Sequence, residues 1–243
     1  MVSDSCKKRF GKIMLEQMEL LEQVEIAPNI FSMILKGQMV SQMQAGQFLH
    51  IRVPDDSKLL RRPISIAEID RDNLTCRIIY RIEGGGTAIF SQLPFGAFLD
   101  VMGPQGNGFD LSPVRAGDHA LIIGGGIGVP PLLEVAKELH AKGARVTAVL
   151  GYADKSAVIL EAEMKKYAEV IVTTDNGSYG RQGYVSAVVD ELSQDYVAVY
   201  SCGAPAMLQY VDHKFQDHPH AYLSMESRMA CGMGACYACV VHV

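Results

Sequence analysis

Three of the chain's six cysteines lie within nine residues near its C-terminal end, in the order Cys231-x4-Cys236-x2-Cys239. Plant-type iron–sulfur proteins use this spacing to place thiolates around a [2Fe–2S] cluster. Gly232 and Gly234 allow the backbone to curl around an inorganic core. A segment this short has no hydrophobic core of its own, so a bound group or neighbouring parts of the chain must organise it. The spacing therefore predicts an iron–sulfur segment.

The three cysteines leave such a cluster one ligand short. Four ligands are needed, no cysteine follows Cys239, and Cys6, Cys76 and Cys202 lie far upstream in other contexts. His242 offers a nitrogen, but mixed-ligand clusters use paired histidines, so we interpret it as an ordinary strand residue. A zinc knuckle or buried thiols are the alternative interpretation, although zinc sites usually repeat a Cys-x2-Cys pair.

Composition excludes several classes of partner. With 22 Lys and Arg against 27 Asp and Glu, the net charge of −5 offers no attraction to DNA or RNA. The longest apolar stretch, Ala120 to Val129, is broken by glycines and followed by two prolines, so it cannot cross a bilayer as one helix. Residues 1–12 hold charges and lack the apolar core of a signal peptide. We therefore expect a cytoplasmic protein, in whose reducing surroundings a metal is favoured over disulfides.

The rest of the chain divides into two parts with different patterns. Short β-rich runs separated by Pro, Gly and Asp or Asn predict an antiparallel barrel over residues 1–104. Apolar strands that alternate with helices predict a mostly parallel sheet over residues 105–222, and the iron–sulfur segment takes residues 223–243. The expected strands are 31–35, 48–53, 76–80, 98–102, 119–123, 145–150, 170–173 and 196–200, and the expected helices are 131–140, 160–167 and 185–192.

A glycine-rich turn joins the first strand of the second part to a helix that opens with prolines. Backbone N–H groups at such a turn can hold a pyrophosphate against the helix N-terminus, although the spacing departs from G-x-G-x-x-G and a simple tight turn is the alternative. Asp154, after the next strand, lies where ribose hydroxyls are read, which favours NAD; Lys155 beside it weakens that preference. The glycines of the turn are Gly124, Gly125, Gly126 and Gly128.

Three motifs in the barrel half suit a flat cofactor that carries phosphates. In the first, two guanidinium groups can neutralise a diphosphate and a hydroxyl can bond a heterocycle, although a solvated strand edge would look the same. The second adds an aromatic ring and a cation, and the third is a flexible loop that opens a helix. The three are Arg61-Arg62-Pro63-Ile64-Ser65, Ile79-Tyr80-Arg81 and Gly84-Gly85-Gly86-Thr87.

Taken in order, the motifs resemble the ferredoxin reductase superfamily over nearly the whole chain. The resemblance is carried by Arg62 to Ser65, Gly86-Thr87, Gly124 to Pro131, and Cys202-Gly203-x-Pro205-x-Met207. The ending, residues 226–239, is similar to one family within it, the electron transfer subunits of type B dihydroorotate dehydrogenases.

The resemblance implies an FAD in the barrel, an NAD in the second part and a [2Fe–2S] cluster at the end. It places Ser65 near the reactive flavin nitrogen and Cys202 beside the nicotinamide; for Cys202, a small buried residue at a strand end is the alternative. The loop 174–180 would face the cofactor cleft, although turn chemistry alone explains it. The implied FAD contacts are Arg62, Pro63, Ile64, Ser65, Ile79, Tyr80, Arg81, Gly86 and Thr87; the NAD contacts are Gly124, Gly125, Gly126, Gly128 and Asp154; and the metal ligands are Cys231, Cys236 and Cys239.

The resemblance also implies a function. A separate FMN-containing catalytic subunit oxidises dihydroorotate, and electrons pass through the cluster and FAD of this chain to NAD+, in a heterotetramer of two plus two subunits. An exposed apolar segment, residues 225–237, suits that interface. The family's fourth cluster cysteine lies further along, so we expect a longer C-terminus in the functional protein. The alternatives are an NAD(P)H:ferredoxin-type reductase or bifurcating flavoprotein subunit, and a non-catalytic nucleotide-sensing or zinc-stabilised module.

Overall fold

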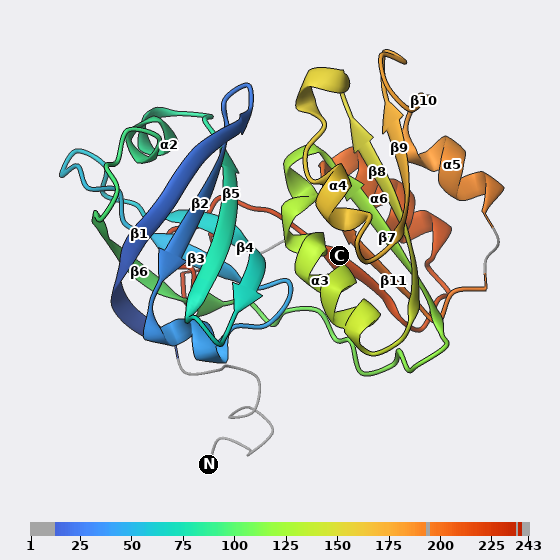
Figure 1. Ribbon diagram of the computed structural model, residues 1–243, viewed down its shortest axis with the longest axis horizontal. Coiled ribbons are helices and arrows are strands. Elements are labelled where there is room, and N and C mark those ends of the chain that lie inside the picture. Colours follow the sequence, from blue (N-terminus) through green and yellow to red (C-terminus); the bar gives the residue numbers. More distant parts are fainter. Residues whose placement is uncertain (1–12, 193–194, 237, 240–243) are drawn as a thin grey trace. The chain divides into compact units, whose positions relative to one another are not determined.

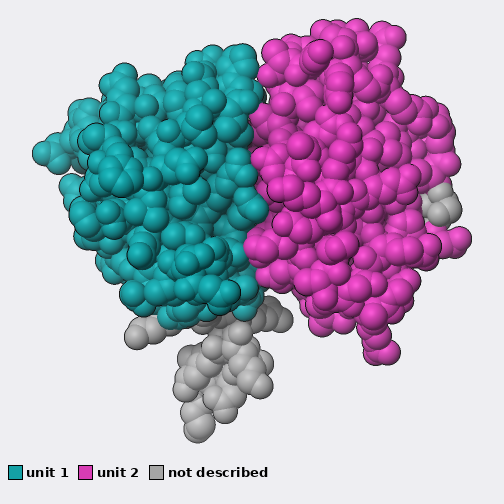
Figure 2. All heavy atoms as spheres, viewed as in Figure 1, with its two compact units in different colours: residues 1–108, 226–243 teal, residues 109–225 magenta. Residues whose placement is uncertain are grey.

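The computed structural model describes residues 13–192, 195–236 and 238–239. The chain forms two compact units, which Figure 2 colours separately. The first unit contains residues 1–108 and 226–243, and the second contains residues 109–225. The cysteine-rich segment therefore belongs to the first unit, although the whole second unit separates it from that unit along the chain.

Six antiparallel strands of the first unit close into a barrel, in the order β1-β2-β5-β4-β3-β6 (Figure 1). Closure pairs every strand on both sides and so leaves no open sheet edge. The predicted antiparallel barrel is confirmed. The elements are β1 (Met14–Ala27), β2 (Ile30–Lys36), η1 (Gln38–Gln42), β3 (Phe48–Ile51), β4 (Arg62–Asp70), β5 (Thr75–Arg81), α2 (Gly85–Phe90) and β6 (Phe98–Gln105).

Apolar side chains from all six strands fill the barrel. Met18 and Leu20 stand two positions apart on β1, and both are fully buried, as are Leu35 of β2, Ile78 of β5 and Val101 of β6. Alternate residues of a strand point to opposite faces, so this spacing sends one set of side chains into the interior. Removing these side chains from water is the main force that holds the barrel together.

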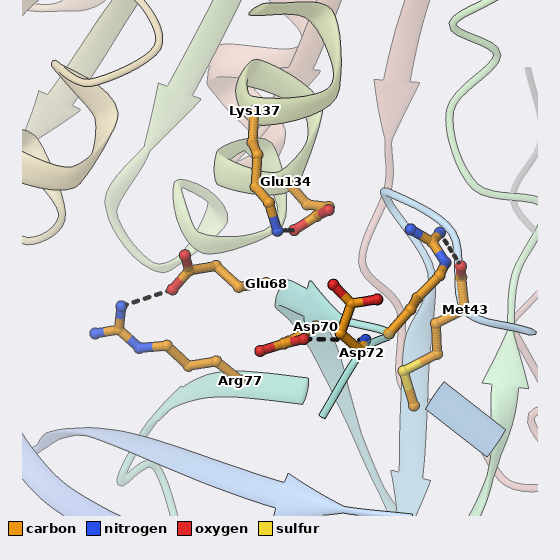
Figure 3. A network of polar contacts seen from close by, with 8 residues as sticks. Met43, Glu68, Asp70, Asp72, Arg77, Glu134 and Lys137 are labelled. Atoms are coloured by element: carbon orange, nitrogen blue, oxygen red, sulfur yellow. Dashed lines mark hydrogen bonds and ion pairs between the residues drawn. The ribbon is translucent and has the colours of Figure 1, made fainter. Parts of the chain in front are cut away.

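Polar side chains at the barrel surface join neighbouring strands. Arg77 of β5 pairs with Glu68 of β4 at 2.9 Å (Figure 3), and its Nε donates to the hydroxyl of Ser32 on β2 at 2.7 Å. The carboxylate of Asp70 accepts a hydrogen bond from the Asp72 N–H at 3.1 Å, which closes the turn between β4 and β5. These contacts fix the register of three adjacent strands.

The second unit is built on six parallel strands in the order β10-β9-β8-β7-β11-β12 (Figure 1). The predicted parallel sheet is confirmed. The chain runs from β7 outward on one side and returns to β11 on the other, so the strand order reverses between these two. The elements are β7 (His119–Gly125), η2 (Gly126–Gly128), α3 (Pro130–Ala141), β8 (Arg145–Tyr152), η3 (Lys155–Ala157), α4 (Glu161–Met164), β9 (Glu169–Thr174), β10 (Arg181–Gln182), α5 (Val185–Glu191), β11 (Ala198–Cys202), α6 (Pro205–Lys214) and β12 (Ala221–Ser224).

Helices pack against the central strands of this sheet, which are largely apolar. Leu121 and Ile123 of β7 pack in one cluster with Val188 of α5 and Val211 of α6. The alternate residues of β7 are fully buried as well, which a strand covered on both faces requires. Helix α4 is shorter than the predicted 160–167, because Leu160 adopts a left-handed φ of 61° and the chain turns after Met164. None of the helices in the described ranges is long and apolar enough to span a membrane.

Candidate functional site

The motif expected to hold a flavin lies at the start of β4, where this strand pairs with β3. Arg62, Pro63, Ile64 and Ser65 are all partly exposed, whereas Ile66, which follows them, is fully buried. A ligand can therefore reach four consecutive residues of the strand before the strand enters the core. The structure thus places these four predicted residues together on one accessible stretch of backbone.

The two neighbouring arginines of this motif have different surroundings. Arg61 Nη1 donates to the backbone carbonyl of Asp100 and Nη2 donates to its carboxylate, both at 2.8 Å. Arg62 instead lies over the first turn of α2, where a Cβ added to Gly86 would come within 2.6 Å of Arg62 Nε. A guanidinium carries fixed donors, so Arg61 is committed to the barrel wall and only Arg62 faces the loop expected to hold phosphates.

We expect Arg61→Ala to affect mainly stability and Arg62→Ala to affect mainly flavin binding. Loss of the partly buried ion pair and hydrogen bonds of Arg61 should lower the free energy of unfolding by about 1–3 kcal/mol. Arg62→Ala should leave stability nearly unchanged but lower flavin content, because its guanidinium is the expected phosphate ligand. Urea unfolding and the flavin-to-protein absorbance ratio measure the two effects, and identical profiles for the two variants would contradict the assignment.

The loop before α2 is held by the Thr87 hydroxyl. Thr87 Oγ1 accepts hydrogen bonds from the N–H groups of Glu83 at 3.0 Å and Gly84 at 3.3 Å, and it donates to the Gly84 carbonyl at 3.1 Å. Thr87 therefore shapes the loop. Arg81, the cation of the neighbouring motif, pairs with Glu83 while remaining about half exposed. An exposed pair of this kind is weak, so Arg81 can still turn to an anionic ligand.

Tyr80 and Ile79 of β5 are buried. The Tyr80 ring stacks on Phe31 with centroids 5.9 Å apart and meets Phe90 edge-to-face, and its hydroxyl donates to the Gln23 side chain at 3.1 Å. Burial raises the pKa of the phenol above its ordinary value, so the hydroxyl stays protonated. The Tyr80 ring is therefore packed in the barrel core, and the contact of Ile79 and Tyr80 with the flavin stays a prediction.

The glycine turn of the second unit lies between β7 and α3, at the carboxyl ends of the central strands. A Cβ on Gly128 would lie 2.5 Å from the Cys202 carbonyl oxygen, and one on Gly125 would lie 2.8 Å from Met207 Sδ. Gly126 adopts a left-handed φ of 53°. The turn therefore needs glycine both for conformation and for close approach to β11. Ligands of open parallel sheets bind at such a reversal of strand order, outside the carboxyl ends of the strands.

Cys202 ends β11 and is fully buried, beside Gly124 of β7 in the sheet register. The structure thus brings the two predicted parts of the nucleotide motif, the turn and the Cys202-Gly203 segment, into direct contact. Met207, on the first turn of α6, packs against Gly125 and Gly203. A buried thiol at this place fits either a neighbour of the ligand or a small packing residue.

Asp154 follows β8 at the same edge of the sheet, but its carboxylate already has partners. It accepts hydrogen bonds from the Ser156 N–H at 2.7 Å and the Ser156 hydroxyl at 2.6 Å, and these bonds lower its pKa. Asp154 therefore caps η3 as well as lying where a ribose would be read. The adjacent Lys155 N–H donates to the Ser178 hydroxyl at 2.8 Å, which ties this loop to the loop 174–180.

In the cysteine segment, backbone groups converge on one sulfur. Met233 N–H donates to Cys231 Sγ at 3.3 Å, and this bond, with further donors at Ala235 and Cys236, lowers the pKa of the Cys231 thiol to about 6. Iron–sulfur clusters are bound by cysteine thiolates, and N–H groups around the sulfur stabilise the thiolate form. This part of the segment therefore fits an iron–sulfur cluster. Within the described ranges, no three His, Cys, Asp or Glu side chains gather as a metal site.

Some predicted features lie only partly within the described chain. Cys6, Tyr237 and His242 are outside it. Of the apolar segment predicted at residues 225–237, Met225 and Met233 are about half exposed.

Models of known families match three parts of the chain. Residues 17–109 match an oxidoreductase FAD-binding domain, residues 122–213 match an oxidoreductase NAD-binding domain, and residues 226–243 match the iron-sulfur cluster binding domain of dihydroorotate dehydrogenase B. The chain therefore carries the three kinds of binding domain that its motifs predict, in the predicted order.

Curated relatives and solved structures agree with these matches. The dihydroorotate dehydrogenase B (NAD(+)) electron transfer subunit of Streptococcus mutans is 69% identical, over 95% of this chain and 90% of its own length. The same subunit of Enterococcus faecalis is 49% identical, over 93% and 88%. An NADH-dependent reduced ferredoxin-NADP oxidoreductase, described in work on electron bifurcation, superimposes with a TM-score of 0.81 at 27% identity, over 92% of this chain and 81% of that one. The ferredoxin reductase of carbazole 1,9a-dioxygenase shares the fold, with a TM-score of 0.74 at 19% identity, over 87% and 69%. The chain belongs to the family of dihydroorotate dehydrogenase B (NAD(+)) electron transfer subunits.

Proposed function

We propose that this chain carries electrons from the FMN of a separate dihydroorotate-oxidising subunit, through a [2Fe–2S] cluster and FAD, to NAD+ in pyrimidine biosynthesis. The observation that carries the proposal is the grouping of the cysteine segment and the FAD-binding barrel in one unit, in a chain that also holds an NAD-binding domain. A flavin supplies the conversion that such a path needs, because it exchanges single electrons as well as a hydride. The protein's task is to bind and orient these groups.

Residues of the first unit would hold the flavin. Arg62 is the guanidinium that faces the loop before α2, so it suits the diphosphate. The partly exposed residues of β4 from Pro63 to Ser65 would offer polar groups to the flavin ring, with the Ser65 hydroxyl near its reactive nitrogen. Arg81 adds a second positive charge, and Gly86 gives Arg62 the space it occupies.

Residues of the second unit would hold NAD. The glycine turn presents backbone N–H groups to the pyrophosphate, and Asp154 accepts a hydrogen bond from the ribose. Cys202, directly behind the turn, would border the nicotinamide. At the other end of the path, Cys231, Cys236 and Cys239 would provide thiolates for the cluster.

We also propose the assembly and its place in the cell. The chain would form a cytoplasmic heterotetramer of two copies with two FMN-containing catalytic subunits. Its net charge of −5 supports the expectation that nucleic acid is not a partner. Dihydroorotate itself would be oxidised only on the catalytic subunit.

A second candidate is an NAD(P)H:ferredoxin-type reductase or a bifurcating flavoprotein subunit, with electrons flowing outward from nicotinamide. The likeness to the NADH-dependent reduced ferredoxin-NADP oxidoreductase favours it, since that structure superimposes over most of both chains. The two candidates use the same kinds of binding domain and differ in the protein with which they exchange electrons.

Purification with the catalytic subunit tests the proposal. We expect the two chains to purify together with FAD, FMN, iron and sulfide, and to reduce NAD+ when dihydroorotate is added. A chain that reduces other carriers efficiently with NADH and never binds the dihydroorotate-oxidising subunit would favour the reductase. Zinc in place of iron, with no flavin absorbance, would favour the zinc-stabilised binding module.

A further inference from the structure

Two buried polar side chains of the barrel strands β3 and β6 have unsatisfied hydrogen-bonding groups among the described residues. His50 of β3 is fully buried and Gln105, the last residue of β6, is 2% exposed. Neither ring nitrogen of His50 and neither side-chain atom of Gln105 has a hydrogen-bond partner among the residues that the structure describes. Burying such groups without partners costs free energy, so buried polar atoms are nearly always bonded. The pair therefore calls for an acceptor and donor that the barrel itself does not supply.

Both side chains point at the cysteine segment. A Cβ built on Gly232 would lie 2.6 Å from His50 Nδ1 and 2.6 Å from Gln105 Oε1. Gly232 directly follows Cys231 and has a left-handed φ of 68°, so glycine allows both the backbone turn and the close approach. His50 and Gln105 thus lie on the wall of the FAD-binding barrel against Gly232, the residue that follows the first cysteine of the segment.

The same wall borders a cavity of about 200 Å³. Gln105 lines this cavity from the barrel side, and Gly232, Gly234 and Cys239 line it from the cysteine segment. Gly232 follows the expected ligand Cys231, and Cys239 is itself an expected ligand, so the segment around two of the three cysteines borders the same cavity as Gln105. This arrangement makes the cysteine segment the partner that Gln105 and His50 face.

The two side chains can act as donors. Burial and the charges of Arg61 and Arg62 lower the pKa of His50, so its ring is neutral and holds one N–H and one lone pair. Gln105 offers two N–H groups and a carbonyl oxygen. A bond between the two side chains would still leave N–H groups for a third partner. The negatively charged sulfur atoms of a loaded iron–sulfur loop are acceptors that these N–H groups would satisfy.

We propose that His50 and Gln105 are positioning residues for the iron–sulfur centre, which donate hydrogen bonds from the barrel wall to the sulfur-rich face of the loaded loop. The inference rests on the proposed function, because it requires that the loop holds a [2Fe–2S] cluster. Reduction adds one negative charge to that centre, so donors directed at its sulfurs favour the reduced form. The pair would therefore raise the reduction potential of the cluster and hold the loop against the barrel.

The test uses the full chain in its complex, with reductive titration of the cluster followed by electron paramagnetic resonance. We expect Gln105→Leu and His50→Leu each to lower the ratio of reduced to oxidised cluster at a fixed poise by about tenfold, equivalent to 59 mV for one electron. The resonance positions should shift as well, while FAD content stays constant. His50→Gln, which keeps an N–H donor, should restore part of the change. Gln105→Met, which closely matches glutamine in size, gives the same measurement if the leucine variants fold poorly.

Thr173 provides the matched control. Its hydroxyl is also buried without a partner among the described residues, but it lies in the second unit. Thr173→Val should therefore leave the cluster potential unchanged. Unaltered potentials and spectra in Gln105→Met and His50→Leu, with normal iron and sulfide content, would overturn the inference while leaving the proposed function intact. Absence of iron and sulfide from the unsubstituted complex would overturn both.

Discussion

Replacing Cys236 with serine is expected to remove iron from the chain and to lower dihydroorotate-dependent NAD+ reduction by about 100-fold or more. Loss of a residue that only supports a metal ligand already lowers metal affinity or activity by about 10–100-fold, and Cys236 is an expected ligand itself. Cys236 is exposed on the cysteine segment, where its thiol also hydrogen-bonds to Cys231. It lies in neither hydrophobic core, so flavin content and NADH-dependent dye reduction should largely survive. Iron analysis, the flavin spectrum and the two activities measure the separation.

Cys76 is the matched control for this substitution. It lies fully enclosed in the barrel core, where burial raises the pKa of its thiol to about 12, so it is not a reactive thiolate. Cys76→Ala should lower the free energy of unfolding slightly, through lost packing, while iron content stays normal. Full dihydroorotate-dependent flux in Cys236→Ser, or loss of iron in Cys76→Ala, would refute the relay through the cysteine segment.

The alternation of strands and helices predicted the second unit well, whereas the first strand of the barrel carried a misleading pattern. Glu16, Glu19, Glu22 and Glu25 recur every third residue of β1, which is closer to a helical period than to the period of two in a strand. Register shifts after Leu20 and after Glu25 let this sequence pair with β2 all the same. Pairing with two neighbouring strands outweighs the local preference, and such pairing is not visible in one segment.

The motifs located the candidate sites along the chain but did not reveal which way each side chain points. Tyr80 lies in the motif predicted for the flavin, yet its ring belongs to the barrel core. Arg61 and Arg62 are adjacent and chemically identical, and only the fold separates the first, bonded to Asp100, from the second, which is partly exposed and lies beside Gly86. The spacing of a motif shows which residues are neighbours in sequence. The contact of Arg61 with Asp100, in contrast, forms only when the barrel closes.

His50 and Gln105 were beyond sequence reasoning for a related cause. A polar residue within an apolar strand ordinarily points outward into solvent. The sequence Phe48-Leu49-His50-Ile51 therefore predicts an exposed His50. The His50 side chain does lie on the face opposite the core that Leu49 and Ile51 fill, yet it is fully buried. The reason is a contact from residue 232, far along the chain, which no local pattern encodes.

Gly128→Ala should be the most damaging single-methyl change in the nucleotide motif. The added Cβ would lie 2.5 Å from the Cys202 carbonyl oxygen and 2.6 Å from the Gly203 nitrogen. Both are backbone atoms at the end of β11, which is held in register with β7, so they cannot rotate away as a side chain would. We expect the free energy of unfolding to fall by about 1–3 kcal/mol, as overpacking of an interior costs.

The same displacement should act on nucleotide binding. If the turn's N–H groups hold the pyrophosphate, moving them by a fraction of an ångström should raise the NADH concentration for half-maximal dye reduction by about tenfold or more, because a misplacement of about 1 Å can cost 100-fold. FAD and iron belong to the other unit and should be retained. Gly126→Asn separates the two possible causes: position 126 has open space and a left-handed φ that asparagine tolerates, so its stability should stay close to that of the unsubstituted chain. If Gly128→Ala and Gly126→Asn lower the free energy of unfolding equally, the turn needs glycine for its conformation alone. The close approach of Gly128 to Cys202 would then have no effect on stability.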